Sequence, residues 1–100
     1  MTTVTKAQAE KALAEVARQL GEMNGGIKIP TGPDAAYHGD GPELNMTWNW
    51  SGEPRPTILL ESSMFPEWAL EIDSSKVSAA AGVFAEPYSS YALTLYPKED

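Results

Sequence analysis

The sequence contains no cysteine, a single histidine and no long apolar run. Without cysteine the chain cannot form a disulfide, a thiolate nucleophile or a cysteine metal site. No stretch approaches the roughly 20 apolar residues that cross a bilayer. The first residues also lack the apolar core and the cleavage site of a secretory signal. We therefore expect a cytoplasmic protein with no membrane partner.

Basic residues are also scarce, with seven Lys and Arg against 14 Asp and Glu and a net charge of −7. Three acids and three bases lie up to Glu22, which leaves eleven acids and four bases beyond it. A surface of this charge repels phosphate backbones, so no nucleic-acid partner is expected. It suits a protein partner with a basic patch. The plainer alternative is that acidity keeps a small protein soluble.

Length and composition are those of an ordinary globular domain. The chain has 100 residues, of which 42% are hydrophobic and 21% are charged. A chain of this size builds one hydrophobic core. We therefore treat residues 1–100 as a single domain.

The clearest predicted element is a helix over residues 5–21. Thr5 and Gln8 have the spacing of a capping box, and Gly21 is expected to end the helix. Between them, apolar residues recur at helical spacing on one face: Ala9, Ala12, Leu13, Val16, Ala17 and Leu20. Half of this face is alanine, so the helix can approach a sheet that carries large side chains.

Residues 22–42 form a predicted loop rich in glycine and proline. With Gly21 included, the segment contains six of the eight glycines and three of the eight prolines. Ile27 and Ile29 suggest a short edge strand within it. Long loops in compact domains are commonly functional, so this loop is the first place to look for a site.

A sheet is predicted over residues 43–97. Residues 43–50 alternate strictly, residues 57–61 point Ile58 and Leu60 inward, and residues 91–97 form the last strand. In the last strand, one face is formed by Tyr91, Leu93 and Leu95, and in the first strand by Leu44, Met46, Trp48 and Trp50. We expect these faces to lie in the core. An exposed aromatic platform at Trp48 and Trp50 is the alternative.

Two further segments are less regular. Residues 67–73 alternate and favour a strand with Trp68, Leu70 and Ile72 inward, although Pro66 could instead open a helical turn. Near residues 75–85 the sequence allows a short helix capped by Ser75 but does not decide it. The predicted fold is thus an α+β two-layer domain, in which one N-terminal amphipathic helix packs on a mostly antiparallel sheet of four or five strands.

Catalytic motifs are weak. The one histidine, His38, would have to serve any Ser-His-Asp site, and a metal site would need it together with Asp34, Asp40 and Glu43. That spacing matches no calcium loop or HExxH helix. No phosphate loop follows Gly25-Gly26 either. We therefore expect no enzyme activity, no metal and no cofactor.

The residues favour a binding function. We expect a small acidic protein that occupies a macromolecular partner, as inhibitors, immunity proteins and phage accessory proteins do. Interface centres use aromatic and apolar side chains, and surrounding charge supplies specificity. The predicted partner-binding residues combine an acidic strand face with apolar neighbours: Glu67, Glu71, Asp73, Leu59 and Phe65.

Two alternatives remain. A small-ligand binder would hold a nucleotide or metabolite between the 21–42 loop and the aromatic residues Tyr37, His38, Trp48 and Trp50. A structural subunit would assemble, with itself or another chain, through an unpaired sheet edge. If the chain binds a macromolecular partner, changes in the acidic face should weaken binding and changes in the loop should not. A small-ligand binder would show the opposite.

Overall fold

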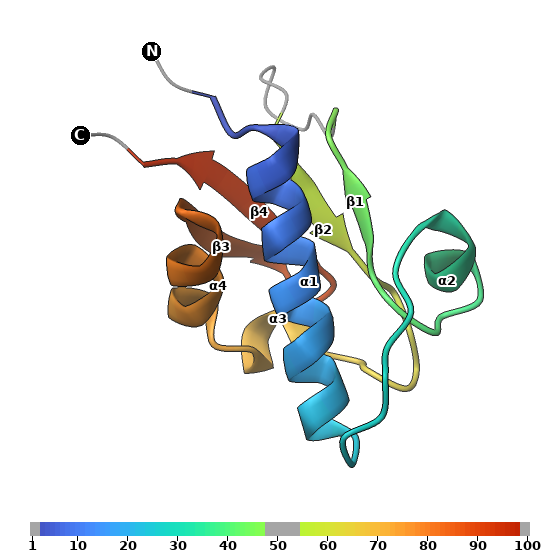
Figure 1. Cartoon of the computed structure of the whole chain (residues 1–100). Helices are drawn as coiled ribbons and strands as arrows, with labels where there is room; N and C mark the ends of the chain where they lie inside the picture. Colours follow the sequence, from blue (N-terminus) through green and yellow to red (C-terminus); the bar gives the residue numbers. More distant parts are fainter. Residues whose placement is uncertain (1–2, 48–54, 99–100) are drawn as a thin grey trace.

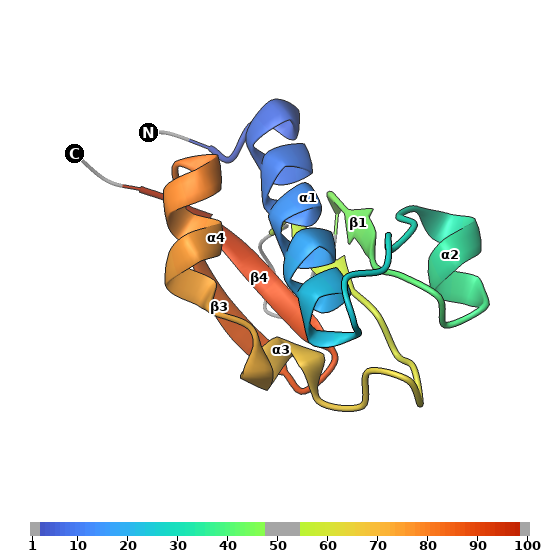
Figure 2. The same cartoon turned by 60° about the horizontal axis from the view of Figure 1, so that its bottom comes forward.

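The computed structural model describes residues 3–47 and 55–98 (Figure 1). In chain order the elements are α1 (Lys6–Met23), α2 (Pro33–Tyr37), β1 (Glu43–Asn45), β2 (Thr57–Leu59), α3 (Trp68–Glu71), α4 (Ser74–Ala81), β3 (Val83–Ser89) and β4 (Ala92–Pro97). The sheet order is β1-β2-β4-β3, and all neighbours are antiparallel. Helices α1 and α4 lie over one face of the sheet, and α2 stands beside β1 (Figure 2). The predicted α+β two-layer fold is confirmed.

Helix α1 begins with the predicted capping box. The Gln8 N–H donates to Thr5 Oγ1 at 3.1 Å, and the Thr5 N–H donates to Gln8 Oε1 at 3.0 Å. Two of the amides that a helix start leaves free are thereby satisfied. Local hydrogen bonds therefore hold the first turn.

The alanine-rich face of α1 is buried as predicted. Ala9, Ala12, Val16 and Leu20 are fully buried, whereas Leu13 is only partly buried. Opposite this face lie the largest buried side chains of the core: Ile58, Leu60, Trp68, Leu93 and Leu95. Small side chains on the helix leave room for these large ones.

Helix α1 continues past its predicted end at Gly21. It ends at Met23, and the N–H of the cap residue Asn24 donates to the Gly21 carbonyl at 3.1 Å. Gly21 is buried inside the helix, where a Cβ would lie 2.4 Å from the Ile27 carbonyl oxygen. The missing side chain therefore lets the returning chain cross α1 closely, and it does not end the helix.

The segment 22–42 is more ordered than the loop prediction. It contains helix α2, which opens with Pro33 at its first position and Asp34 in its first turn. The chain closes around α2, because the Gly32 N–H donates to the Pro42 carbonyl at 2.9 Å. The predicted edge strand at Ile27 and Ile29 is wrong. Ile29 is buried instead, and Ile27 is exposed.

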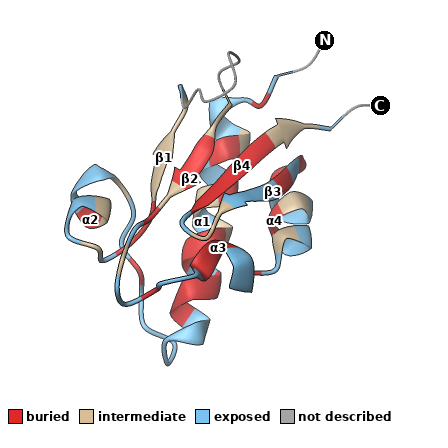
Figure 3. Ribbon diagram, turned by 180° about the vertical axis from the view of Figure 1, so that it is seen from behind, coloured by how far each residue is buried: buried red, intermediate tan, exposed pale blue. Residues whose placement is uncertain are grey.

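The sheet alternates between a helix-facing and an outward face. Ile58 pairs with Leu93 and with Leu44, and these side chains face the helices. No described helix lies over the outward side of β2 and β4 (Figure 3). Trp48 and Trp50, together with the rest of the predicted strand beyond residue 47, lie outside the described residues.

The prediction of a strand at residues 67–73 is wrong. Trp68–Glu71 forms helix α3, in which Trp68 and Ala69 are buried and Leu70 is 59% exposed. The Trp68 indole donates to the Leu60 carbonyl at 2.7 Å. Trp68 and Ile72 are four residues apart, so their spacing fits a helical face as well as a strand. Pro66 was the signal that favoured the helical turn.

Helix α4 settles the open segment near 75–85. Its cap is Asp73 and not Ser75, since the Asp73 carboxylate accepts the Ser75 and Lys76 amides at 3.1 and 3.3 Å. Gly82, at φ +68°, ends the helix in the left-handed conformation. Strand β3 starts at the next residue, so the third strand of the chain comprises residues 83–89 and not residues 67–73.

Gln19 joins α1 to the junction between α3 and α4. Its amide oxygen accepts the Asp73 N–H at 2.7 Å, and its nitrogen donates to the Asp73 carbonyl at 3.1 Å. The same nitrogen donates to Glu15 at 2.8 Å. Gln19, a polar residue on the buried side of α1, thus provides hydrogen-bond partners for the backbone N–H and carbonyl of Asp73 at the junction between the two helices.

Truncation should show which side of α1 faces the core. We expect Leu20→Ala to lower the free energy of unfolding by about 2–5 kcal/mol, because Leu20 is fully buried. Ala14 is exposed, so Ala14→Ser should change it by less than about 0.5 kcal/mol. Urea unfolding of both variants checks the difference. Equal losses would contradict the orientation of the helix.

Two paired threonines on the outward face give a second test. Thr57 and Thr94 are Cα partners and both are buried, but only Thr57 uses its hydroxyl, which donates to the Arg55 carbonyl at 3.0 Å. Within residues 3–47 and 55–98, the buried Thr94 Oγ1 has no hydrogen-bond partner. We expect Thr94→Val to raise the free energy of unfolding by up to about 1 kcal/mol, because an unpaired buried hydroxyl is unfavourable.

The matched control is Thr57→Val, which removes a hydrogen bond at the neighbouring position. It should lower the free energy of unfolding by about 1 kcal/mol. Both variants keep a β-branched side chain in a strand, so propensity does not separate them. The prediction concerns the sign of the two shifts in the urea midpoint, and the two shifts need not be equal in size. Destabilisation by Thr94→Val as large as that by Thr57→Val would refute the assignment.

Candidate functional site

The charge excess is concentrated in the middle of the chain. Between Lys28 and Lys76 the only base is Arg55, whereas the acids are Asp34, Asp40, Glu43, Glu53, Glu61, Glu67, Glu71 and Asp73. In the fold, this stretch supplies α2, β1, β2, α3 and the cap of α4. The acidic excess of the sequence is therefore carried by these elements.

Ion pairs occur elsewhere. Within residues 3–47 and 55–98, the two ion pairs join Arg18 to Glu15 at 2.7 Å and to Glu22 at 2.6 Å, both on α1. The hydrogen bond from Arg18 lowers the pKa of Glu15 below its ordinary value. None of the described acids from Asp34 to Asp73 takes part in an ion pair with another described residue. Their charge is left for solvent or for a partner.

One hollow, which we name the Tyr91 hollow, lies between β1, β2 and the turn before β4. It has a volume of about 210 Å³ and is lined by Ala36, Glu43, Leu59, Leu60, Glu61 and Tyr91. Glu43 lies directly opposite Leu59 in the β1–β2 register. The Leu60 N–H donates to the Tyr91 carbonyl at 3.1 Å, which holds the turn against the end of β2.

A second hollow, the His38 hollow, adjoins the first through Glu61. Its volume is about 320 Å³, and its lining is largely polar: Tyr37, His38, Gly39, Asp40, Glu61, Ser62, Ser63 and Met64. The Ser62 hydroxyl donates to the Gly39 carbonyl at 2.7 Å and so ties the end of α2 to the segment after β2. The loop and the strand end thus form one continuous acidic region.

The predicted ligand residues meet only in part. Tyr37 and His38 are in edge-to-face contact, with ring centroids 5.1 Å apart, and Tyr37 is 86% exposed. Trp48 and Trp50, the other two residues of that prediction, lie outside the described residues. In the part of the chain that is described, no three His, Asp or Glu side chains come together to hold a metal ion.

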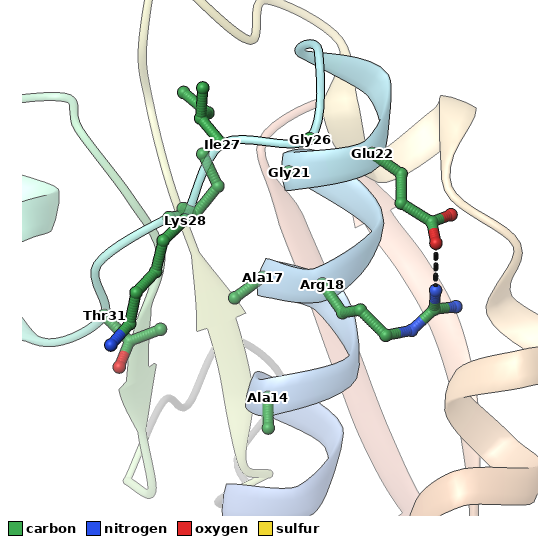
Figure 4. Close-up of a pocket in the computed structure, with 10 residues that line it drawn as sticks. Ala14, Ala17, Arg18, Gly21, Glu22, Gly26, Ile27, Lys28 and Thr31 are labelled. Atoms are coloured by element: carbon green, nitrogen blue, oxygen red, sulfur yellow. Dashed lines mark hydrogen bonds and ion pairs between the residues drawn. The ribbon is translucent and has the colours of Figure 1, made fainter.

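A third hollow is a groove along α1 (Figure 4). It has a volume of about 460 Å³, and small residues of the helix form its floor: Ala14, Ala17 and Gly21. The segment 26–31 forms the facing wall, with Lys28 extended along it toward Thr31. Arg18 turns away from that wall toward Glu22. Its floor is apolar, unlike the largely polar lining of the His38 hollow.

The predicted partner-binding residues do not share one strand face. Glu67 and Glu71 are exposed at α3, and Asp73 caps α4. Leu59 lies apart from them and lines the Tyr91 hollow. Phe65 is 7% exposed and belongs to the core, so it offers no surface for a partner. The common acidic face was a consequence of the incorrect strand.

Of the residues that line the Tyr91 hollow, only Leu59 was predicted as partner-binding, and the polar residues Glu43, Glu61 and Tyr91 were not. Tyr91 was expected to face the core, but it lies in the turn before β4 and is 38% exposed. Glu43 and Glu61 flank Leu59 from two directions, one across the sheet and one along the chain. Glu61 has the same parity as the outward Leu59, so the sequence could have predicted that both lie on the outward side. The position of Glu43 beside Leu59 follows only from the pairing of β1 with β2.

The sheet edges are poorly suited to strand pairing. Strand β1 has three residues. Strand β3, at the other edge, carries Pro87, followed by a register shift before Ser89. Proline lacks a backbone donor, and a bulge bends the edge, so both features oppose the addition of another strand.

Comparison of the chain with known protein families, with characterised proteins and with solved structures finds no match. Among the described helices, none is long and apolar enough to cross a membrane. The function therefore has to be inferred from the geometry and charge of the surface.

The cap of α4 generates a pH prediction. Hydrogen bonds from the Ser75 side chain and from the first amides of α4 hold the pKa of Asp73 below its ordinary value. A lowered pKa contributes stability above the unfolded value, about 3.9, and this contribution is lost as the pH falls further. We expect the melting temperature of wild type to exceed that of Asp73→Asn at pH 7, and we expect this difference to shrink below about pH 4.

Thermal unfolding of both proteins between neutral and strongly acidic pH measures this difference. Asparagine is a comparable cap but does not titrate, so it isolates the charge. Asp73→Ala serves as the control, since it loses the cap at every pH. A wild-type advantage over Asp73→Asn that stays constant across the acid range would contradict the role of the charge.

Proposed function

We propose that this chain is a small, non-enzymatic, cytoplasmic binding protein that acts by occupying a basic macromolecular partner. The observation that carries the proposal is the surface from α2 to α3, where the described carboxylates are unpaired and stand beside exposed aromatic residues. Inhibitors and immunity or phage accessory proteins act in this way.

Charge and apolar contact have separate roles in such a surface. Unpaired carboxylates raise the rate of encounter with a cationic partner, and salt screens this effect. Exposed aromatic residues supply the contact that persists after encounter. Tyr37 and Tyr91, which are 86% and 38% exposed, stand at the two hollows that Glu61 joins.

A protein partner fits this surface better than a nucleic acid or a lipid surface. Binding of a phosphate backbone requires lysine or arginine side chains along the contact. The described lining of the Tyr91 and His38 hollows contains neither. The repulsion would grow with each phosphate, whereas a basic protein patch would gain from each carboxylate.

A small-ligand function has one observation in its favour. The His38 hollow brings Tyr37 and His38 together with two serines and two carboxylates in a space of about 320 Å³. Such a site suits an uncharged or cationic metabolite, with hydrogen bonds to its polar groups. A nucleotide is disfavoured, because Asp40 and Glu61 would face its phosphates.

The test begins with a partner obtained by affinity capture from the native host and identified by mass spectrometry. Association and dissociation rates are then measured at two salt concentrations. We expect Glu67→Lys with Glu71→Lys to slow association several-fold and to weaken its salt dependence, because steering depends on the field of the acidic surface. Glu10→Lys on α1 is the matched control, outside the acidic stretch.

The small-ligand alternative gives the opposite pattern. Tyr37→Ala and His38→Ala would then abolish binding of a co-purified metabolite, and that metabolite would raise the melting temperature of wild type. An association rate that responds to neither salt nor charge reversal would overturn the proposal. So would a slowing by Glu10→Lys as large as that by the α3 reversals.

A further inference from the structure

We propose that the Tyr91 hollow is a socket for one cationic side chain of the partner, arginine in preference to lysine. This inference rests on the proposed function, which it makes specific by naming the recognised group. Its evidence is the combination of an apolar floor, an exposed tyrosine and two unpaired carboxylates in one hollow.

The floor of the hollow suits the stem of a long side chain. Leu59 and Ala36 are partly buried, and Leu60 beneath them is 1% exposed. Lysine and arginine both cover apolar surface with their methylene groups while the charged end remains in a polar setting. A volume of about 210 Å³ accommodates one such side chain rather than an element of secondary structure.

Both carboxylates line the hollow at the end of β2. Glu43 is the register partner of Leu59, the last residue of β2, and Glu61 follows two residues later in the chain. A group bound in the hollow can therefore meet both. A guanidinium, whose donors spread over a plane, reaches two carboxylates better than an ammonium does.

The aromatic residue strengthens the preference for a cation. Tyr91 lines the hollow and is 38% exposed. Cations are attracted to the face of an aromatic ring, and arginine makes this contact more often than lysine. The same molecule already contains such a pair, with the Arg55 guanidinium carbon 5.1 Å from the centre of the Tyr96 ring.

Among the described residues, this chain supplies no cation to the hollow. Neither Glu43 nor Glu61 makes an ion pair within the described residues, and no lysine or arginine lines the hollow. An apolar occupant would leave both carboxylates without compensation and would remove water from them at a cost. An anionic occupant would be repelled. A cationic side chain pairs with both carboxylates, and its methylene groups cover the apolar floor.

The test uses N-acetyl-arginine amide as the probe and follows backbone amide shifts by NMR. N-acetyl-citrulline amide, which has nearly the same shape without the charge, is the control ligand. We expect saturable shifts at Glu43, Leu59, Glu61 and Tyr91 with the arginine probe and not with citrulline. Glu43→Gln combined with Glu61→Gln should weaken this binding on the order of tenfold, because both charge-assisted contacts are lost.

Glu67→Gln combined with Glu71→Gln removes the same number of charges elsewhere and is the matched control. It should leave the arginine affinity within about twofold, since neither Glu67 nor Glu71 lines the hollow. Shifts that spread over all acidic residues, equal shifts with citrulline, or no shifts would overturn the socket. Retention of the wild-type amide spectrum by the Glu43→Gln and Glu61→Gln variant shows that the fold is intact.

Failure of the socket is distinguishable from failure of the proposed function. If the captured partner binds with salt dependence but ignores Glu43→Gln and Glu61→Gln, the socket is wrong and the function stands. If binding ignores salt and every charge change, the function itself fails. If the two glutamine substitutions speed dissociation of the partner on the order of tenfold, while the α3 pair mainly alters association, both are supported.

Discussion

The packing of α1 against α4 and on the side chains of the sheet is the constraint on which the rest of the structure depends. The face of alanines on α1 leaves space that Ile58, Leu93 and Trp68 fill. Because this one helix also packs against α4, its buried side has to meet a sheet and a helix at once. Gln19 makes that possible by satisfying the backbone at Asp73, where α3 gives way to α4.

The same packing decides where the charge lies. The bases of α1 are matched by acids on the same helix, and Arg18 holds two of them. The acids of the middle segment have no such neighbours, because α2, β1 and α3 contribute almost no cations. The helical layer is thus electrically balanced, whereas the region around α2 and the end of β2 carries the excess. The result is an acidic surface with exposed tyrosines.

The sequence predicted the fold correctly where several local signals indicated the same structure. The capping box, the apolar stripe of α1 and the inward Ile58 all agreed with one another, and the structure confirms each of them. The segment 67–73 failed because Trp68 and Ile72 satisfy both a strand and a helix period. The candidate site was less predictable. Tyr37 and His38 are neighbours in the chain, but the Tyr91 hollow joins β1, β2 and the turn before β4, which only the register brings together.

The sequence by itself determined the composition of each layer: one helix with a small apolar face, strands with alternating large residues, and an acidic excess beyond Glu22. Those features depend on neighbours within a few positions, so the order of residues contains them directly. The tertiary structure alone decided that Gly21 would admit a crossing chain, that Phe65 would be buried and that Glu43 would stand opposite Leu59. Each of these outcomes depends on contacts between distant segments, whose geometry is set by the packing of the whole core.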